Sequence, residues 1–413
     1  MKLKNTALLM KSSKKLSRAE LTDRILNRGV DQLIERKHLE KALSSGKKLR
    51  VKLGIDPTSP DLHLGHAVVL RKLRDFQDLG HKIVFIIGDF TAKVGDPSGR
   101  SKERPVLTDQ EIRTNMRGYL EQAGEIIDVK KAEVRHNSEW LSGKVENILE
   151  LAKAATLNQV SERADFKARI KSGQRVSMLE GLYSLLQGFD SVNIKADIEL
   201  GGNDQLLNLL MGRQVQRHFG MKEQDVLTVA LLEGTDGVEK MSKSKDNYIA
   251  LNSESKEMFG KLMSVPDKLI YKYFELCTDV SKDELKAIKS GLFKKGVNPM
   301  EYKLRLAEEV VAMYRGQQEA TKAKEEFINV FSKGNIPQNI PSKTLIKTNY
   351  LLVDLLMATD MALSKSDARR LIKQGGVKIN GEKIINPNLN IKISPKTLLL
   401  QVGKQKFLKV KSR

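Results

Sequence analysis

Residues 49–88 read LRVKLGIDPTSPDLHLGHAVVLRKLRDFQDLGHKIVFIIG, and this stretch decides the fold. It opens with an alternating segment at 49–55, which is typical of a strand. Residues 56–60 hold two prolines and indicate a loop, and 65–79 follow as a helix. Residues 82–88 are a short apolar run, as a buried parallel strand requires. Strand, helix and strand form a βαβ unit, so the sequence predicts an α/β fold with a doubly wound parallel sheet.

Outside this unit the sequence predicts helices and two further strands. Apolar residues at three- and four-residue spacings predict a helix over residues 19–43. Residues 108–188 are mostly helical, without a strong strand pattern. Residues 194–200 and 226–232 are strand candidates, and 253–331 are again helical.

The chain of 413 residues is long enough for about two to four domains. Two prolines within five residues, Pro337 and Pro341, mark the best linker, because proline cannot continue a helix. The predicted segments are an N-terminal helical segment 1–48, an α/β domain 49–235 with a helical insertion at about 128–177, a helical domain 236–332, a linker 333–346 and a C-terminal domain 347–413.

Composition excludes several classes of protein. With 40% hydrophobic and 30% charged residues the chain can bury a sizeable core. One cysteine, Cys277, excludes an intramolecular disulfide and a Cys-based zinc site. No apolar run approaches the roughly 18 residues that span a bilayer. Without a recognisable secretory signal, we expect a cytoplasmic protein with no membrane partner.

The formal charge of +21 has two interpretations. It predicts attraction to a polyanion such as nucleic acid, or it reflects a lysine-rich composition that keeps the protein in solution. Residues 1–19 contain six Lys and Arg and no acid. This basic start is either a targeting segment or the solvated beginning of a helix.

His63-Leu64-Gly65-His66 lies where the loop after the first strand enters a helix, the place where doubly wound folds bind ligands. The two histidines share one face of the helix start, and Gly65 lets a planar ligand approach the backbone. A helix N-terminus also favours phosphate. The alternatives are an incidental histidine pair or a metal site that lacks its third ligand.

Lys240-Met241-Ser242-Lys243-Ser244 lies in a Gly-rich loop after the last predicted strand. Two lysines three residues apart can close over a triphosphate as mobile charges, although Lys-x-x-Lys by itself means little in so basic a chain. Neither a Gly-x-x-x-x-Gly-Lys-Ser/Thr loop nor a Gly-x-Gly-x-x-Gly fingerprint is present.

With both motifs in this order, the chain resembles the tyrosyl-tRNA synthetases, a family of class I aminoacyl-tRNA synthetases. The likeness runs from about residue 20 to the C-terminus. The supporting segments are Gly54-Ile55-Asp56-Pro57-Thr58, Gly95-Asp96-Pro97-Ser98-Gly99, Tyr183-Ser184-Leu185-Leu186-Gln187 with Asp190, and Gly201-Gly202-Asn203-Asp204-Gln205. The resemblance implies a Rossmann-like catalytic domain, an α-helical anticodon-region domain and a small α+β S4 RNA-binding domain.

The resemblance also implies a reaction. L-tyrosine and ATP would form tyrosyl-adenylate and diphosphate, and the tyrosyl group would pass to the 3′ end of tRNA(Tyr). A carboxylate nucleophile needs no general base, so catalysis would rest on positioning and on stabilising phosphate charge. Mg²⁺ would accompany the phosphates, with no metal ligands assigned. The implied catalytic residues are His63, His66, Lys240 and Lys243, and the further ATP-binding residues are Asp56, Gly65, Gly202, Asp204 and Ser242.

By the same resemblance, one set of polar residues would recognise tyrosine. Asp190 would accept the phenolic hydroxyl, and phenylalanine would be rejected because it leaves that buried group unpaired. The alternative for Asp190 is a helix-capping or surface carboxylate. The implied tyrosine-binding residues are Gly54, Asp56, Asp96, Tyr183, Gln187, Asp190 and Gln205.

The sequence departs from the better-known bacterial branch of the family at two places, and the first of them, Lys52, resembles the second bacterial branch. Lys52 stands where the better-known branch has a tyrosine that contacts the substrate hydroxyl. Lys52 could replace that hydrogen bond, pair with Asp190 or point elsewhere. Arg100 stands where that branch begins a lysine pair, and we expect it to serve the phosphates.

The C-terminal segment resembles the S4 domain. Ser364 and Asp367 predict the start of a helix, and Asn380-Gly381 predicts a hairpin turn within 377–385. Between residues 347 and 413 there are four acidic residues and many more basic residues. This concentration of positive charge favours RNA binding as its role over a general effect on solubility. The expected tRNA-binding residues are Lys365, Arg369, Arg370 and Lys373. The family further implies a homodimer joined through the helical insertion; its rivals are a tryptophan enzyme and a non-catalytic RNA-binding relic.

Overall fold

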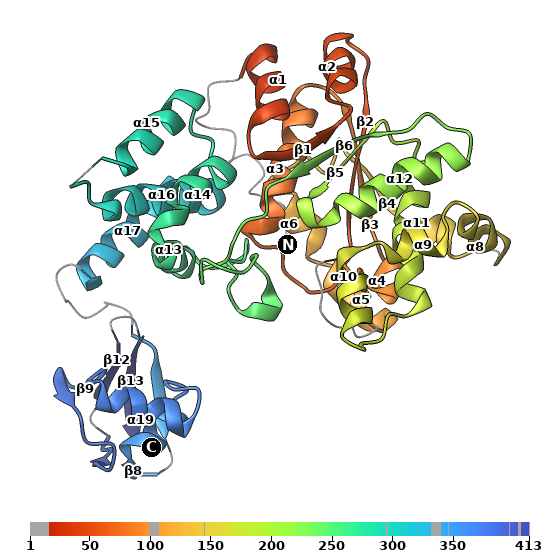
Figure 1. The fold of residues 1–413 in the computed structure, drawn as a ribbon. Coiled ribbons are helices and arrows are strands. Elements are labelled where there is room, and N and C mark those ends of the chain that lie inside the picture. The colour runs from red at the N-terminus through yellow and green to blue at the C-terminus, as the bar shows by residue number, and fades with distance from the viewer. Residues whose placement is uncertain are drawn as a thin grey trace. The chain divides into compact units, whose positions relative to one another are not determined.

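The computed structural model describes residues 16–98, 107–143, 145–294, 296–331, 340–345, 347–395, 397–403 and 406–412 (Figure 1). It divides into two compact units, Met1–Ala320 and Thr321–Arg413. The predictions for the basic start up to residue 15, for Arg100 and for the proline at 337 lie outside the described residues.

The larger unit holds one sheet and most of the helices. Its strands are β1 (Val30–Ile34), β2 (Arg50–Ile55), β3 (Lys82–Ile87), β4 (Glu133–His136), β5 (Ile198–Gly202) and β6 (Asp225–Val229). The helices up to the last strand are α1 (Arg18–Asn27), α2 (Arg36–Ser44), α3 (Leu64–Asp78), α4 (Thr91–Val94), α5 (Asp109–Met116), α6 (Tyr119–Ala123), α7 (Ser138–Leu141), α8 (Val145–Ala152), α9 (Leu157–Ser161), α10 (Ala164–Lys171), α11 (Met178–Asn193) and α12 (Leu206–His218). The helices that follow are α13 (Ser255–Ser264), α14 (Ile270–Cys277), α15 (Lys282–Leu292) and α16 (Pro299–Arg315), and α17 (Gln317–Phe331) runs into the second unit.

The six strands form a doubly wound sheet in the order β1-β6-β5-β2-β3-β4. All neighbours are parallel except β1, which pairs antiparallel with β6. The predicted βαβ unit is therefore confirmed as β2, α3 and β3. The chain leaves β2 toward β3 on one side and later returns to β5 on the other, which opens a crevice at the carboxyl ends of β2 and β5.

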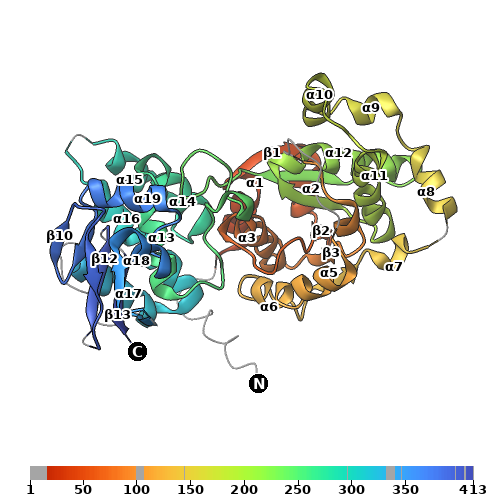
Figure 2. The same ribbon diagram turned by 90° about the horizontal axis from the view of Figure 1, so that it is seen from below.

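Helices cover both faces of this sheet. Figure 2 shows α3 on one side of the strands and α11 and α12 on the other. The strands are apolar on both faces, as parallel strands must be when helices cover them: Val51, Phe85 and Ile198 are fully buried. On α3, Leu70 and Leu73 are fully buried too. Each such side chain stabilises the fold by about 1.5–3 kcal/mol. This buried core fixes the strands whose carboxyl ends form the crevice.

Two strands differ from the prediction. Residues 30–34, expected within a helix over 19–43, form β1, so the segment before residue 49 contributes a strand to the sheet. Gly29 explains the break, because its φ of +63° is left-handed and a Cβ there would meet Leu276 at 2.5 Å. β4 lies in the stretch expected to be helical. Both are short edge strands whose hydrogen bonds come from distant segments, so local periodicity does not reveal them.

The second unit is a small α+β structure. Its elements are β7 (Ser342–Leu345), β8 (Asn349–Leu351), α18 (Leu352–Ala358), α19 (Lys365–Lys373), β9 (Val377–Ile379), β10 (Glu382–Ile384), β11 (Asn390–Lys392), β12 (Leu398–Val402) and β13 (Lys406–Ser412). Ser364 caps α19 as predicted, by accepting a hydrogen bond from the Asp367 backbone. The predicted hairpin is confirmed: β9 and β10 pair across Asn380 and Gly381, which both have positive φ.

Among the helices that the structure describes, none is both long enough and apolar enough to cross a bilayer.

Candidate active site

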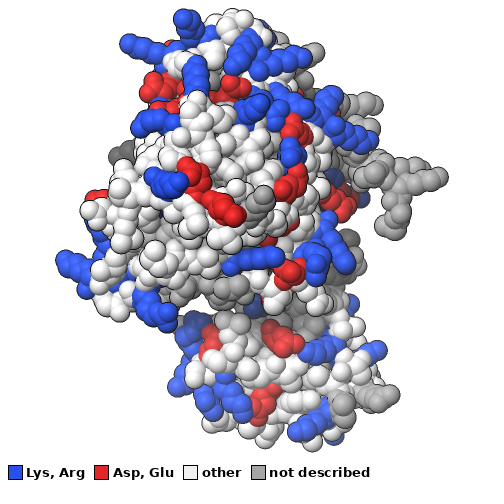
Figure 3. All heavy atoms as spheres, turned by 90° about the vertical axis from the view of Figure 1, so that its right-hand side faces the viewer, with Lys and Arg blue, Asp and Glu red and all other residues white. Residues whose placement is uncertain are grey.

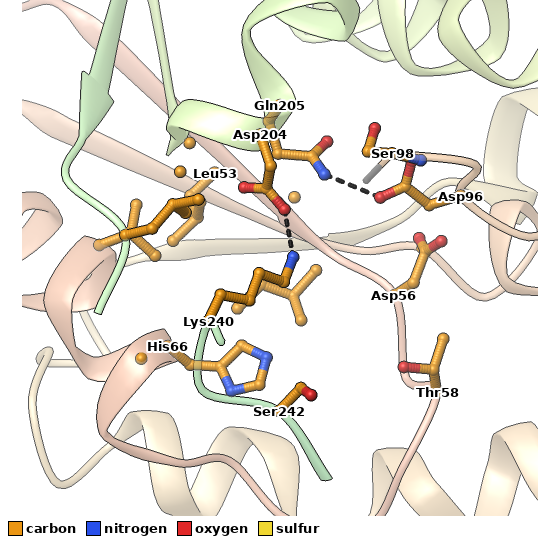
Figure 4. Close-up of a pocket in the computed structure, with 18 of the residues that line it drawn as sticks. Leu53, Asp56, Thr58, His66, Asp96, Ser98, Asp204, Gln205, Lys240 and Ser242 are labelled. Atoms are coloured by element: carbon orange, nitrogen blue, oxygen red, sulfur yellow. Dashed lines mark hydrogen bonds and ion pairs between the residues drawn. The ribbon is translucent and has the colours of Figure 1, made fainter. Parts of the chain in front are cut away.

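A cavity of about 1010 Å³ opens in the larger unit at the carboxyl ends of β2 and β5 (Figure 4). Of the residues that the sequence assigns to ATP or tyrosine, all those in the described part of the chain line it: Gly54, Asp56, His63, Gly65, His66, Asp96, Tyr183, Gln187, Asp190, Gly202, Asp204, Gln205, Lys240, Ser242 and Lys243. Segments nearly 190 positions apart along the chain therefore meet in one crevice. Its position is where an open α/β sheet binds its ligand.

The histidine pair begins α3. His63 is the N-cap residue, and the rings of His63 and His66 lie 3.9 Å apart between centroids. The His63 backbone N–H donates to His66 Nδ1 at 3.3 Å, which leaves the proton of a neutral His66 on Nε2. Burial lowers the pKa of His66 to about 4, with the positive charges of Lys240 and Lys243 acting in the same direction. Burial also lowers the pKa of His63. Both rings are thus neutral hydrogen-bonding groups at pH 7 in the absence of a ligand.

The two lysines of the loop are paired with carboxylates of the same cavity. Lys240 pairs with Asp204, as Figure 4 shows. Lys243 Nζ lies 2.8 Å from Asp61 Oδ2. All four side chains line the same cavity, and the charges of both lysines lower the pKa of the two histidines.

The lysine loop has its own internal order. Asn247 Oδ1 accepts from the Ser242 backbone at 2.8 Å, and Asn247 Nδ2 donates to Asp236 at 2.7 Å and to the Lys240 carbonyl at 3.2 Å. The loop is therefore held as a unit by one buried amide.

Asp190 lines the same cavity from α11. Its side chain is 3% exposed, so the alternative of a surface carboxylate is excluded. Trp140 Nε1 donates to Oδ1 at 2.8 Å and Asn137 Nδ2 to Oδ2 at 3.4 Å. Burial raises the pKa of Asp190 to about 7, against the opposing effects of the Lys52 charge and of these two donors.

Two further carboxylates, Asp56 and Asp96, line the same cavity. Asp56 accepts from the Tyr183 hydroxyl at 2.9 Å and from Thr91 Oγ1 at 2.7 Å. Asp96 accepts from Gln205 Nε2 at 2.7 Å, and Figure 4 shows this contact at the cavity wall. Such a group of acceptors suits an ammonium ion.

Lys52 is not one of the described residues that line the cavity. Its side chain is fully buried behind the cavity wall. Its Nζ is 2.8 Å from Glu199 Oε1 and donates to the Gln187 carbonyl at 2.7 Å and to Ser191 Oγ at 2.8 Å. Of the three possibilities left open by the sequence, Lys52 points elsewhere, to a buried glutamate that the sequence did not single out.

Several functional candidates were missed by sequence reasoning. Trp140 is the only tryptophan in the chain, which is a usable signal, whereas Asn137 and Thr91 carry none. Asp61 and Asn208 are likewise identified only by their contacts: Asn208 Nδ2 donates to Gln205 Oε1 at 2.9 Å.

The residues expected to bind tRNA lie in the second unit, outside the cavity. Lys365, Arg369, Arg370 and Lys373 are all exposed and all belong to α19. Lys365 pairs with Asp354 and Arg370 with Asp367. For metal ions, no group of three or more His, Cys, Asp or Glu side chains suited to hold one occurs in the described part of the chain.

Comparison with known families identifies the class. Residues 44–332 match the model of "tRNA synthetases class I (W and Y)", and residues 333–410 match that of the "Tyrosine--tRNA ligase SYY-like C-terminal domain". A solved structure of a C-terminally truncated mitochondrial tyrosyl-tRNA synthetase from Aspergillus nidulans superposes with a TM-score of 0.63 at 21% identity, over 76% of this chain and 94% of that one. At this identity the likeness shows the fold, which is that of the class I synthetases.

Curated relatives narrow the class to one enzyme. A tyrosine–tRNA ligase from Thermotoga maritima is 47% identical over 94% of this chain and 96% of its own length. Another, from Moorella thermoacetica, is 45% identical over 94% and 95%. The chain belongs to the tyrosine–tRNA ligase family.

Proposed function

We propose that this protein is a tyrosine–tRNA ligase that activates L-tyrosine with ATP and transfers the tyrosyl group to the 3′ end of tRNA(Tyr). One observation carries the proposal beyond family membership. A single cavity joins the His63–His66 and Lys240–Lys243 pairs to a buried carboxylate, Asp190.

The phosphate end of the cavity would act by charge and hydrogen bonding. The tyrosine carboxylate attacks the α-phosphorus of ATP, the bond to the β-phosphate oxygen breaks, and diphosphate leaves. His63 and His66 would donate to the phosphates at the N-terminus of α3, where the helix dipole favours negative charge. Lys240 and Lys243 would exchange Asp204 and Asp61 for the departing diphosphate.

ATP would fill the region between these groups. Gly65 and Gly202 would let the nucleotide approach the backbone, with Ser242 and Asp56 beside it, and Asp204, once released by Lys240, would hold the ribose. The described residues offer no carboxylate cage for a metal. We therefore assign Mg²⁺ to the substrate, as the complex in which ATP arrives.

The amino-acid end would select tyrosine. Asp190 would accept the phenolic hydroxyl, beside the donors Trp140 and Asn137. Asp96, Tyr183 and Gln187 would receive the α-amino group, with Gln205 and Gly54 completing the pocket. Phenylalanine has no hydroxyl for Asp190 and would withhold that donor from the buried carboxylate. The indole N–H of tryptophan is itself a donor, so the choice of tyrosine over this sister substrate is supported by the tyrosine–tRNA ligases among the relatives.

The division of the chain follows from the same assignment. We assign residues 1–48 to an N-terminal segment and 49–235 to the catalytic domain. Residues 236–332 would hold the lysine loop and the anticodon-region helices, 333–346 a linker, and 347–413 an RNA-binding domain that acts through Lys365, Arg369, Arg370 and Lys373. α19 presents these four basic side chains to solvent, as contacts with phosphates require. A cytoplasmic location fits this role.

A homodimer would form through the insertion at about 128–177. Val145 is 68% and Leu149 is 61% exposed on α8, and Leu157, Ile170 and Met178 nearby are exposed as well. Figure 3 looks at the side where α8 and α9 lie in Figure 1 and shows a broad area of uncharged side chains there. Exposed apolar groups so concentrated mark an interface.

The test is amino-acid-dependent exchange of labelled diphosphate into ATP. We expect exchange with tyrosine and none with tryptophan or phenylalanine, followed by charging of tRNA(Tyr). Exchange with tryptophan alone would overturn the choice of substrate. If His63→Ala and Lys243→Ala left all activities unchanged, the non-catalytic relic would be the better description.

A further inference from the structure

A buried ion pair lies against Gln187, one of the residues that line the cavity. Lys52 and Glu199 are 0% and 1% exposed, and their charged atoms are 2.8 Å apart. Taking two charges out of water costs several kcal/mol per ion before their attraction is counted, so a buried pair is weak as a stabilising device. Its presence therefore calls for a role other than stability.

The sheet dictates the pairing. Lys52 on β2 and Glu199 on β5 are direct partners in the parallel register. Neighbouring residues at the same register position point to the same face, here the face covered by α11. The two strands are those between which the cavity opens.

The Lys52 ammonium group makes three polar contacts, two with α11 and one with the Glu199 carboxylate. It donates to the backbone carbonyl of Gln187 and to Ser191 Oγ, both on α11, and pairs with Glu199. Glu199 in turn accepts from Gln187 Nε2 at 3.1 Å and from Ser191 Oγ at 3.2 Å. Gln187 is thus held at its backbone and at its side chain by the two members of one pair.

The same helix carries Asp190, one turn beyond Gln187. The charged groups that act on Asp190 are Lys52 from β2, which favours its ionised form, and Glu199 from β5, which disfavours it. From the other side Trp140 and Asn137 donate to its oxygens, and the Arg135 guanidinium lies 5.3 Å from the centre of the Trp140 ring. Lys52 is the cation on the buried side.

We propose that the Lys52–Glu199 pair is a positioning element for tyrosine recognition, which fixes Gln187 in the cavity wall and places the Lys52 charge where it favours the carboxylate form of Asp190. This inference rests on the proposed function and deepens it. It assigns roles to two residues that do not touch the substrate, and it explains how a lysine can occupy the place of a tyrosine in the other branch: the lysine acts through Asp190 and Gln187.

The direction of each effect follows from charge. An ionised carboxylate is the stronger acceptor for a phenolic hydroxyl. Loss of the Lys52 charge with Glu199 in place would raise the pKa of Asp190, so tyrosine binding would need a higher pH. Loss of the Glu199 charge with Lys52 in place would lower it. Removal of both charges would bring the titration back toward that of the wild type.

The experiment measures KM for tyrosine and for ATP by diphosphate exchange between about pH 6 and pH 9. For Lys52→Met we expect the tyrosine KM at pH 7 to rise about tenfold and its pH midpoint to move up by about one unit, with the ATP KM within about twofold. We expect Glu199→Gln to lower the pH midpoint of the tyrosine KM. The double variant Lys52→Met/Glu199→Gln should return this midpoint toward the wild-type value. Lys52→Arg keeps the charge and therefore the midpoint, whatever its effect on fit.

Arg50→Met is the matched control, because Arg50 lies on the same strand and pairs with Glu133 away from the cavity. We expect Arg50→Met to leave the pH midpoints of the tyrosine KM and of the ATP KM unchanged. If Lys52→Met raised both KM values equally, or if its tyrosine profile ran parallel to that of the wild type, the pair would be merely structural and the inference would fail. If circular dichroism shows that Lys52→Met does not fold, Glu199→Gln provides the test. A pH midpoint of the tyrosine KM that rises or does not move in Glu199→Gln would overturn the inference. A wild type without tyrosine-dependent exchange would instead refute the proposed function.

Discussion

Lys243 Nζ lies 2.8 Å from the Asp61 carboxylate, two residues before His63. This contact docks the lysine loop on the segment that carries the histidine pair. Both partners keep more than a fifth of their side-chain surface exposed, and pairs so accessible to water are worth about 0–1 kcal/mol. A triphosphate carries more charge than one carboxylate, so the nucleotide can displace Asp61 at little cost.

The first prediction concerns this lysine. Lys243→Ala should lower kcat for diphosphate exchange by about 10²–10³-fold, because one charge-stabilising donor is lost in the transition state. The tyrosine KM should stay within about twofold. Steady-state exchange kinetics check this, with Lys282→Ala as control: Lys282 pairs with Asp23 outside the cavity. Equal losses in both variants would show that net charge, and not Lys243, matters.

The second prediction concerns selectivity. Asp190→Asn should raise the tyrosine KM strongly and reduce the preference for tyrosine over phenylalanine by about 10²-fold or more, because the site loses its charged acceptor for the hydroxyl. The ATP KM should change little. Asp78→Asn, an exposed carboxylate paired with Arg74, serves as control. An unchanged preference would remove Asp190 from the tyrosine site.

The third prediction concerns stability and pH. Burial raises the pKa of Asp190 to about 7 in the folded protein, above its usual value of 3.8. A raised carboxyl pKa stabilises the fold at low pH, and this stability is lost as pH rises from about 4 to about 7. Three pKa units correspond to about 4 kcal/mol at most.

Thermal unfolding of wild type and Asp190→Asn across this range checks the third prediction. The Tm of the wild type should fall relative to the variant as pH rises, since the amide does not titrate. A constant difference between the two proteins would mean that Asp190 keeps its ordinary pKa.

The fourth prediction concerns RNA. Replacing Lys365, Arg369, Arg370 and Lys373 by alanine in the full chain should spare diphosphate exchange and weaken tRNA charging, with the largest loss relative to the wild type at low salt, where phosphate contacts contribute most. Filter binding at several salt concentrations measures the effect, and a smaller salt slope is expected for the variant. Undiminished charging would show that α19 is dispensable.

The fifth prediction concerns association. Val145→Lys/Leu149→Lys should convert a dimer to a monomer in sedimentation experiments, because two charges would have to be buried in the interface. Phe293→Lys changes another exposed apolar residue, 82% accessible and far from α8 in sequence, and should leave the dimer intact. Dissociation by both variants, or by neither, would contradict the proposed interface.

Local pattern accounts for much of the fold. The alternation at 49–55 and the apolar run at 82–88 predicted β2 and β3, and Asn380-Gly381 predicted the hairpin of the second unit. These signals are legible because the preference for strand, helix or turn resides in adjacent residues. The edge strands β1 and β4 have no such pattern: their backbone partners are β6 and β3, far away in sequence, and only the assembled sheet provides them.

The sequence by itself also determined which residues would meet, since motifs with phosphate and amino-acid chemistry stood in a recognisable order, and all of them line one cavity. Only the tertiary structure decided what each one touches. Lys52 faces Glu199 because β2 and β5 are neighbours in a parallel register, and Trp140 reaches Asp190 because α7 packs near α11. Such contacts depend on distances between segments far apart in the chain, which no local pattern of residues encodes.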